Sequence, residues 1–378
     1  MAGKENSSFE YIDSRADLTV QIDSKSTIPS LNVVLMGKGP FANDALKGLL
    51  DAGHNVVSVF GPATLDGKDP DAVRKTADDN KIANHKFSSL KEYKTVENLQ
   101  SLKPDLIIGA NLTAFIEDHI ANIATLGMFG FHPSSLPEFR GSSAIPWQII
   151  DGKDEIGMTC YVIGRDEQLE LTANQPERKL PKGSRVNDTK DISDKGPILA
   201  QTVVKLSEGE RTSSTAYSKK ISKLGVAFVV DTTNRLAVAF GEGKIVRGQK
   251  QIKGEGSYQP PLLKEHVRIN WSNGATEIDA LIRGSQFNPG AWTQYKDAKK
   301  NITLYEPIVY EGPTITGGKI ENITNEEVRI SALGGGILGI KSMRSGEMIT
   351  AAQEVKGTAM NAAEFVRKNK LRKGSRFT

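Results

Sequence analysis

The sequence predicts an α/β domain built on a parallel β-sheet, followed by a smaller domain made mostly of β-strands. Apolar runs of strand length alternate with helix-length segments between residues 31 and 253, a pattern typical of parallel sheets. Glycine, proline and polar residues gather at residues 254–261, which we interpret as a linker. Beyond this linker, short strands with frequent glycine indicate a small β-barrel.

The first strand–helix–strand unit supports the parallel sheet. An apolar strand is predicted at residues 31–36, ending at Gly37, and a helix at 41–52, closed by Gly53. A second strand follows at 56–60, and this order favours parallel pairing. The glycine turn after the first strand lacks the full dinucleotide-binding pattern, so it predicts no nicotinamide site.

The rest of the first domain continues this alternation. Further predicted elements are a helix at 71–80, a strand at 105–109, a strand ending at His132, a helix capped by Ser142 or Ser143, strands at 156–163 and 198–199, and a helix within 213–239. Residues 111–113 and His132 each follow a buried strand. Ligands bind at the carboxyl ends of strands in open α/β sheets, so we expect these residues to face one crevice.

Four segments complete the predicted organisation. Residues 1–30 form a polar N-terminal extension, and residues 165–193 form a long charged surface loop without periodicity. The second domain covers residues 254–365, with short strands at 303–305, 319–320, 327–330 and 337–341. Residues 366–378 form a basic tail, which either contacts RNA phosphates or is a solvated end.

Composition excludes several classes of protein. Hydrophobic residues make up 38% of the 378 residues and charged residues 25%, as in soluble globular proteins. No apolar run reaches 18 residues, so we expect no membrane span. Cys160 is the only cysteine, which excludes an internal disulfide and a cysteine zinc site and favours a reducing, cytoplasmic location. The net charge of +4 does not by itself imply nucleic acid.

His132 is the strongest catalytic candidate in the sequence. It is followed by Pro133, by the small polar loop 134–137, and by Arg140 and Gly141. Imidazole is the side chain best suited to moving protons near neutral pH. The alternative is a histidine that only hydrogen-bonds a turn.

Several separated motifs then resemble one family. The stretches His132-Pro-Ser-Ser-Leu-Pro137, Arg140-Gly141 and Asp194-x-Gly196-x-Ile198-Leu199 resemble the formyltransferase family that uses 10-formyltetrahydrofolate. Stretches 269–271, 281–284, 288–293 and 341–353 resemble that family's carboxy-terminal module. The resemblance covers about residues 31 to 365 and implies a Rossmann-like formyltransferase domain followed by an OB-like barrel.

The resemblance also implies a site and its chemistry. His132 would hydrogen-bond the oxyanion or carry the proton, and Asp194 would orient the histidine; no metal is required. The folate would lie against two loops, formed by Asn111, Leu112 and Thr113 and by Ser134, Ser135, Leu136 and Pro137.

Two departures from the family leave alternatives open. The transferases carry asparagine two residues before the histidine, where this sequence has Gly130. Loss of one oxyanion donor costs about 3 kcal/mol, although Asn111 could substitute from the neighbouring strand end. The segment 165–193 is inserted before Asp194, so Asp188 and Asp191 are rival acids, and the insert is either a lid, an acceptor-binding arm or neutral.

Three functions remain open after these departures. The first is an enzyme that passes the formyl group of 10-formyltetrahydrofolate to water or a small amine, like the hydrolase domain of 10-formyltetrahydrofolate dehydrogenase. The sequence shows no stretch that resembles that protein's carrier and aldehyde-oxidising domains, so we expect no reduction of a nicotinamide cofactor. The second is formylation of initiator methionyl-tRNA, and the third is a folate-binding protein without catalysis. The sequence does not predict the oligomeric state.

Overall fold

Two units of structure follow one another with some interleaving along the chain. The computed structural model describes residues 27–62, 72–87, 93–112, 116, 118–164, 170–171, 194–205, 214–244, 246–252, 254–286, 289–295, 301–312, 316–346 and 358–378. The first unit comprises residues up to 141, 156–204 and 221–258, and the second comprises 142–155, 205–220 and 259–378. The extension 1–30 lies mostly outside the described residues, and the insert 165–193 does so except for residues 170–171.

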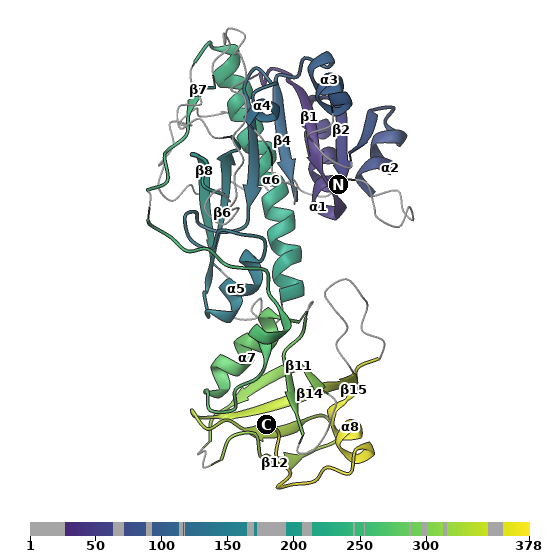
Figure 1. Cartoon of the computed structure of the whole chain (residues 1–378), viewed down its shortest axis with the longest axis vertical. Coiled ribbons are helices and arrows are strands. Elements are labelled where there is room, and N and C mark those ends of the chain that lie inside the picture. The colour runs from purple at the N-terminus through teal and green to yellow at the C-terminus, as the bar shows by residue number, and fades with distance from the viewer. Residues whose placement is uncertain are drawn as a thin grey trace. The chain divides into compact units, whose positions relative to one another are not determined.

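The first unit is built on a seven-stranded sheet flanked by helices (Figure 1). In spatial order its strands are β3 (Ala83–Phe87), β2 (Asn55–Pro62), β1 (Asn32–Gly37), β4 (Leu106–Ala110), β5 (Met128–His132), β6 (Glu155–Val162) and β8 (Ile198–Lys205). Pairing is parallel from β3 to β5, which confirms the predicted parallel sheet. β6 pairs antiparallel with β5, so the sheet is mixed at that end.

Helices and a small ribbon accompany this sheet. They are α1 (Gly39–Asp51), α2 (Ala72–Asp79), α3 (Tyr93–Ser101), α4 (Asp118–Ala121), α6 (Ser214–Gly241), and the strand pair β7 (Glu170–Leu171) and β9 (Val246–Arg247). Strand β1 is buried along five of its six residues, as expected for the centre of a parallel sheet covered on both faces. Its continuous apolar run therefore follows from its position.

Helix α6 is the longest helix among the described residues. Residues 217–241 are long and apolar enough to cross a membrane by length and composition, and 44% of the apolar stretch is buried within the protein. The core helix of a soluble protein meets the same criterion. His54, in the turn before β2, hydrogen-bonds Asn234 of this helix at 2.9 Å, which links α6 to the sheet.

The second unit contains an antiparallel sheet. Its strands in spatial order are β10 (Trp292–Gln294), β11 (Asn301–Tyr310), β14 (Ile337–Gly346), β13 (Val328–Ser331) and β12 (Ile320–Ile323), with β15 (Met360–Asn361) pairing β14. The helices of this unit are α5 (Ala144–Ile150), the 3-10 turn η3 (Lys264–Val267), α7 (Ala275–Gly284) and α8 (Ala362–Lys368). Apolar side chains from sheet and helices form one core.

The C-terminal segment joins the two edges of this sheet. Phe377 bridges to Tyr295 just after β10, and Arg376 bridges to Lys319 just before β12. The backbone of Thr378 exchanges hydrogen bonds of 2.7 and 3.0 Å with Gln294. Phe377 is 1% exposed. Residues 366–378, expected as a basic tail, thus belong to the packed unit and close the strands into a barrel.

The cap predicted for the helix after residue 142 was wrong. Helix α5 begins at Ala144 with Ser143 before it, but the Ser143 side chain does not cap the helix. The Ser143 hydroxyl instead accepts a hydrogen bond of 3.1 Å from the Leu262 backbone N–H. A contact distant in the sequence has taken the oxygen that a cap would use.

Candidate functional site

His132 ends strand β5 at the carboxyl edge of the parallel sheet. Gly130 of β5 lies opposite Gly109 of β4, so Asn111 and His132 each come two residues after this pair. On the other side, His132 lies opposite Thr159 of β6. The His132 residue is 6% exposed, so neighbouring protein groups rather than solvent define the surroundings of its ring.

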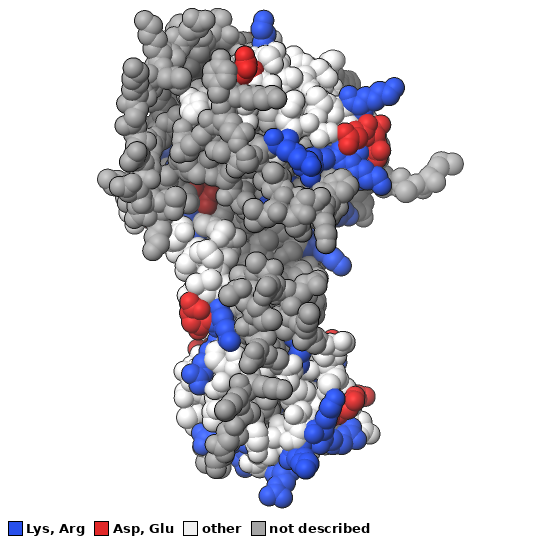
Figure 2. Space-filling view, turned by 45° about the vertical axis from the view of Figure 1, so that its right-hand side comes forward, with Lys and Arg blue, Asp and Glu red and all other residues white. Residues whose placement is uncertain are grey.

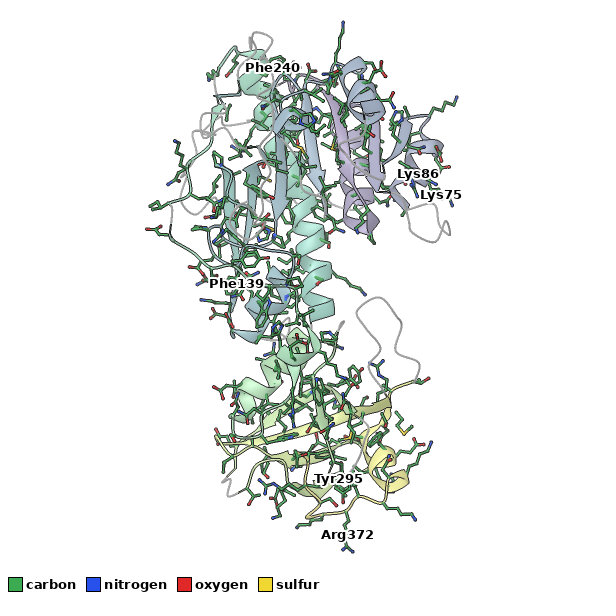
Figure 3. All side chains as sticks on the ribbon, in the orientation of Figure 1. Lys75, Lys86, Phe139, Phe240, Tyr295 and Arg372 are labelled. Carbon is green, nitrogen blue, oxygen red and sulfur yellow. The ribbon has the colours of Figure 1, made fainter. Side chains whose placement is uncertain are left out.

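Both ring nitrogens of His132 face oxygen atoms. Nε2 lies 2.8 Å from the Phe139 carbonyl oxygen, and Nδ1 lies 3.7 Å from Oδ2 of Asp194. A carbonyl can only accept, so Nε2 carries a proton and donates it. A second proton on Nδ1 would create an ion pair with Asp194. The ring therefore lies between a backbone acceptor and a carboxylate. Figure 3 labels Phe139 in the loop after β5.

Asp194 is held at both carboxylate oxygens. Its Oδ1 accepts a hydrogen bond of 2.7 Å from the Tyr161 hydroxyl, and its Oδ2 accepts one of 2.8 Å from the Gly141 backbone N–H. The side chain is 17% exposed. Burial and the negative charge of Asp194 raise the pKa of Tyr161 well above its ordinary value, so the hydroxyl stays protonated and keeps donating.

The backbone at Asp194 is also fixed. Its φ is +56°, in the left-handed region that few residues other than glycine adopt. The Gln251 amide donates to the carbonyl oxygens of Asp194 and Gly196 at 2.7 and 2.8 Å. A Cβ at Gly196 would overlap the Val162 carbonyl oxygen, so glycine lets this turn lie against β6. These contacts bring Asp194 beside a histidine 62 residues earlier in the chain.

The loop 134–137 is anchored largely by its backbone. Thr159 donates to the Ser134 carbonyl at 2.6 Å and accepts from the Leu136 N–H at 3.2 Å, and Gln201 donates to the Leu136 carbonyl at 2.9 Å. Ser134 and Leu136 are buried, and the Ser134 hydroxyl donates to the Glu138 carbonyl. Ser135 and Pro137 are half-buried. Of these four predicted folate contacts, Ser135 and Pro137 are therefore the more accessible.

The predicted contacts after β4 lie at the same edge of the sheet as His132. Asn111 has a φ of +54°, is exposed, and donates through its amide to the Lys38 carbonyl at 3.3 Å. Leu112 is partly buried and packs against the core beside the sheet. Thr113 lies outside the described residues, as do the rival acids Asp188 and Asp191.

Neighbouring side chains crowd the space at Gly130. A Cβ built there would lie 2.8 Å from Cδ1 of Ile163 and 3.4 Å from Cε1 of Tyr161. Tyr161 is also the residue opposite Gly130 in the β5–β6 ladder. Side chains alternate along strands, so position 130 shares a face with His132. Ile163 and Tyr161 thus occupy the space that a side chain at 130 would need.

The second unit carries a separate basic groove of about 1140 Å³. Its lining includes four cations and three aromatic residues, namely Arg268, Arg372, Lys373, Arg376, Trp271, Tyr295 and Phe377. Among the residues that the structure describes, no aspartate or glutamate lines it. Figure 2 shows Lys and Arg side chains gathered at the lower end of the view, over the second unit, and Figure 3 labels Tyr295 and Arg372 there. The chemistry of this groove suits anions.

Sequence patterns singled out His132 and Asp194 but missed the groups that hold them. Tyr161 lies within an ordinary strand pattern, and Gln251 lies in a polar stretch without a motif. Ser257, in the predicted linker, donates through its hydroxyl to Glu138 and accepts from the Phe139 N–H at 2.9 Å. None of these three positions carries a sequence signal, because a tyrosine is ordinary in an apolar strand and the contacts of Gln251 and Ser257 join residues distant in the sequence.

Comparisons with protein families agree with the motifs. The family described as "Formyl transferase" matches residues 31–170, and "Formyl transferase, C-terminal domain" matches residues 261–370. The methionyl-tRNA formyltransferase of Enterococcus faecalis is 25% identical over 339 residues, covering 88% of this chain and 97% of that protein. Cytosolic 10-formyltetrahydrofolate dehydrogenase of Xenopus tropicalis is 27% identical over 349 residues, covering 88% of this chain but 35% of the dehydrogenase.

Solved structures share the fold. HypX from Aquifex aeolicus, in complex with tetrahydrofolic acid, is similar with a TM-score of 0.56 and 16% identity, over 89% of this chain and 47% of HypX. An N-formyltransferase from Helicobacter canadensis, in complex with folinic acid and dTDP-3-aminofucose, is similar with a TM-score of 0.57 and 15% identity, over 82% and 98% of the two chains.

Proposed function

Because this chain belongs to the formyltransferase family, whose members use formyltetrahydrofolate, we propose that it removes the formyl group of 10-formyltetrahydrofolate, with water or a small amine as acceptor. Tetrahydrofolate is the product released. The observation that carries the proposal is the convergence of His132 and Asp194, 3.7 Å apart, at the carboxyl edge of the sheet.

The chemistry requires two proton transfers. In hydrolysis, a water oxygen bonds to the formyl carbon, the bond from that carbon to N10 breaks, and formate and tetrahydrofolate leave. One proton of the water is transferred to N10, and the other is released to solvent when the formic acid ionises to formate. The His132 imidazole, protonated at Nε2, can accept the water proton at Nδ1 and deliver it to N10, and the Asp194 carboxylate stabilises the ring while it is charged.

An oxyanion forms on the formyl oxygen during this reaction. We assign the Nε2–H of His132 as the hydrogen-bond donor to this oxyanion. In the free protein this N–H donates to the Phe139 carbonyl. The formyl oxygen would share or replace that carbonyl as acceptor. The folate would lie beside the loops at 111–113 and 134–137, with Ser135 and Pro137 as its accessible contacts.

Formylation of initiator methionyl-tRNA is the second candidate. The basic groove of the second unit favours it, because a lining of arginine, lysine and aromatic residues suits RNA phosphates and bases. Similarity to methionyl-tRNA formyltransferases over most of the chain supports it as well. A third candidate, folate binding without catalysis, draws its support from the glycine at position 130.

Release of tetrahydrofolate from 10-formyltetrahydrofolate separates the three functions. Release without an added acceptor supports hydrolysis, release that requires a small amine supports transfer to that amine, and release only with methionyl-tRNA supports the second candidate. Folate binding without release under all conditions supports the third and contradicts an enzymatic role.

His132→Ala tests the mechanism in the same assay. We expect turnover to fall by about two to four orders of magnitude, because the proton carrier is removed, while folate still binds. His85→Gln is the control, since His85 lies on β3, the edge strand farthest from β5 on that side of the sheet. Unchanged turnover in His132→Ala would remove this histidine from the reaction.

A further inference from the structure

The Asp194 carboxylate has a side-chain partner besides His132. The Tyr161 hydroxyl donates to Oδ1 at 2.7 Å, while Oδ2 receives the Gly141 N–H at 2.8 Å and faces Nδ1 of His132 at 3.7 Å. A carboxylate held at one oxygen can still rotate about its Cβ–Cγ bond. Contacts at both oxygens fix its plane, so Tyr161 and Gly141 together determine how Oδ2 is presented to the imidazole.

Tyr161 is itself placed by the sheet. It lies on β6 directly opposite Gly130, and its ring is perpendicular to that of His132, with centroids 6.5 Å apart. The missing side chain at 130 leaves room for this ring, whose Cε1 lies 3.4 Å from where a Cβ would be. Gly130 and Tyr161 therefore pack against each other as a complementary pair beside His132.

We infer that Tyr161 is a positioning residue for the reaction, whose hydroxyl holds the Asp194 carboxylate in the orientation that pairs it with His132. The inference rests on the proposed function and deepens it. The hydroxyl acts through Asp194 and contacts no reacting atom. It donates throughout the working pH range, because burial and the Asp194 charge raise the pKa of the phenol and keep it protonated.

Tyr161→Phe removes this hydroxyl and keeps the ring that packs against Gly130. We expect kcat to fall by about tenfold to a hundredfold, the loss typical of one hydrogen bond to a charged group. The KM for 10-formyltetrahydrofolate should change little, because Tyr161 does not bind the folate. An unchanged kcat in the folded variant would overturn the inference.

Tyr217→Phe is the matched control. Tyr217 is a buried tyrosine, 2% exposed, whose hydroxyl has no hydrogen-bond partner within the described part of the chain. Its removal should leave kcat, KM and the His132 signal described next unchanged. Equal losses in both variants would show that deleting any buried hydroxyl has the same effect, and would overturn the specific role of Tyr161.

Nuclear magnetic resonance of ¹⁵N-labelled histidine provides a readout that needs no turnover. The His132 Nδ1 signal should shift in Tyr161→Phe, because the carboxylate facing that nitrogen is reoriented, and should stay in place in Tyr217→Phe. An unmoved Nδ1 signal in Tyr161→Phe overturns the inference. If the unaltered protein releases no tetrahydrofolate with any acceptor, the proposed function fails, and the role of Tyr161 in the reaction fails with it. If the unaltered protein turns over normally and the Tyr161→Phe variant does so equally well, the inference fails while the proposed function stands.

Discussion

A side chain at position 130 would have to displace Ile163. The Cβ alone would lie 2.8 Å from Cδ1 of that residue, a contact that a small rotation of the isoleucine can relieve. An asparagine amide needs more room in the space shared with Tyr161. Gly130→Ala should therefore be tolerated, whereas Gly130→Asn should destabilise the protein by about 1–3 kcal/mol, as overpacking does.

Urea unfolding of a double-mutant cycle tests this packing constraint. Ile163→Ala removes Cδ1 and should be destabilising by itself, because Ile163 packs against the core. Combined with Gly130→Asn, however, the two costs should be less than additive, since the cavity left by one change accommodates the other. Strict additivity would mean that Ile163 does not limit the side chain at position 130.

The residues of the site were predictable where a motif fixes a residue type. His132 and Asp194 carry motif signals, and the structure brings them together. Tyr161 could not be recognised, because a tyrosine in an apolar strand is ordinary, and its role arises only where β6 meets the turn holding Asp194. The burial of Ser134 and Leu136 was not predictable either. Thr159 and Gln201, whose hydrogen bonds anchor that loop, are distant from it in the sequence.

At the scale of elements, His54 ties three segments of the first unit together. Its Nδ1 accepts a hydrogen bond of 3.3 Å from the N–H of Leu31, the residue just before β1, and its Nε2 lies 2.9 Å from the Asn234 amide oxygen on α6. Nδ1 can accept only while it carries no proton. Burial lowers the pKa of His54 from 6.5 and outweighs the opposing effect of the Asn234 hydrogen bond.

This environment makes the stability of the first unit dependent on pH. The unfolded chain binds the His54 proton more readily than the folded one, so protonation favours unfolding. The contribution is complete above about pH 6.5 and is lost as the pH falls through the lower pKa of the folded state. Thermal unfolding between pH 8 and pH 5 should show a smaller loss of stability in His54→Gln than in the unaltered protein.

Asn234→Ala is the control for this titration, because it removes the hydrogen bond to α6 but keeps the imidazole. It should be less stable than the unaltered protein and should still lose stability on acidification. If His54→Gln and the unaltered protein have parallel pH profiles, the acid sensitivity lies elsewhere.

Elements were predictable where burial dictates composition. The central strands β1 and β4 are buried along nearly their whole length, so their continuous apolar runs marked them correctly. The strand β3 was missed, since its sequence Ala83–Phe87 is polar and it lies at the edge of the sheet that the described residues form. The prediction that Ser143 caps a helix fails because its hydroxyl binds the backbone of Leu262, 119 residues away, and no local sequence pattern indicates that contact.

At the scale of the whole molecule, the C-terminal residues show how composition can mislead. Six lysines and arginines between residues 364 and 378 predict a basic tail that either contacts RNA phosphates or is a solvated end. Phe377 is nevertheless buried in the core of the second unit, stacked on Trp271 with ring centroids 6.2 Å apart. Alternation along an extended segment places Phe377 inward and Arg376 outward, so the closing strand brings basic residues to the groove.

The basic groove allows the choice of acceptor to be tested by binding alone. Arg372 and Lys373 line the groove and are exposed, so both can be replaced with little effect on the core. If methionyl-tRNA is the acceptor, Arg372→Gln with Lys373→Gln should weaken tRNA binding. The slope of log affinity against log salt should then decrease by about one for each phosphate that the groove no longer neutralises.

Lys341→Gln with Lys368→Gln is the matched control, because it removes two exposed cations of the same unit that do not line the groove. Binding measured across a salt series should separate the two double variants if the groove is the RNA surface. Equal affinities and equal slopes would show that tRNA, if it binds at all, does so through net charge. The groove would then give no support to a tRNA acceptor, and water or a small amine would remain the acceptor favoured by the His132 site.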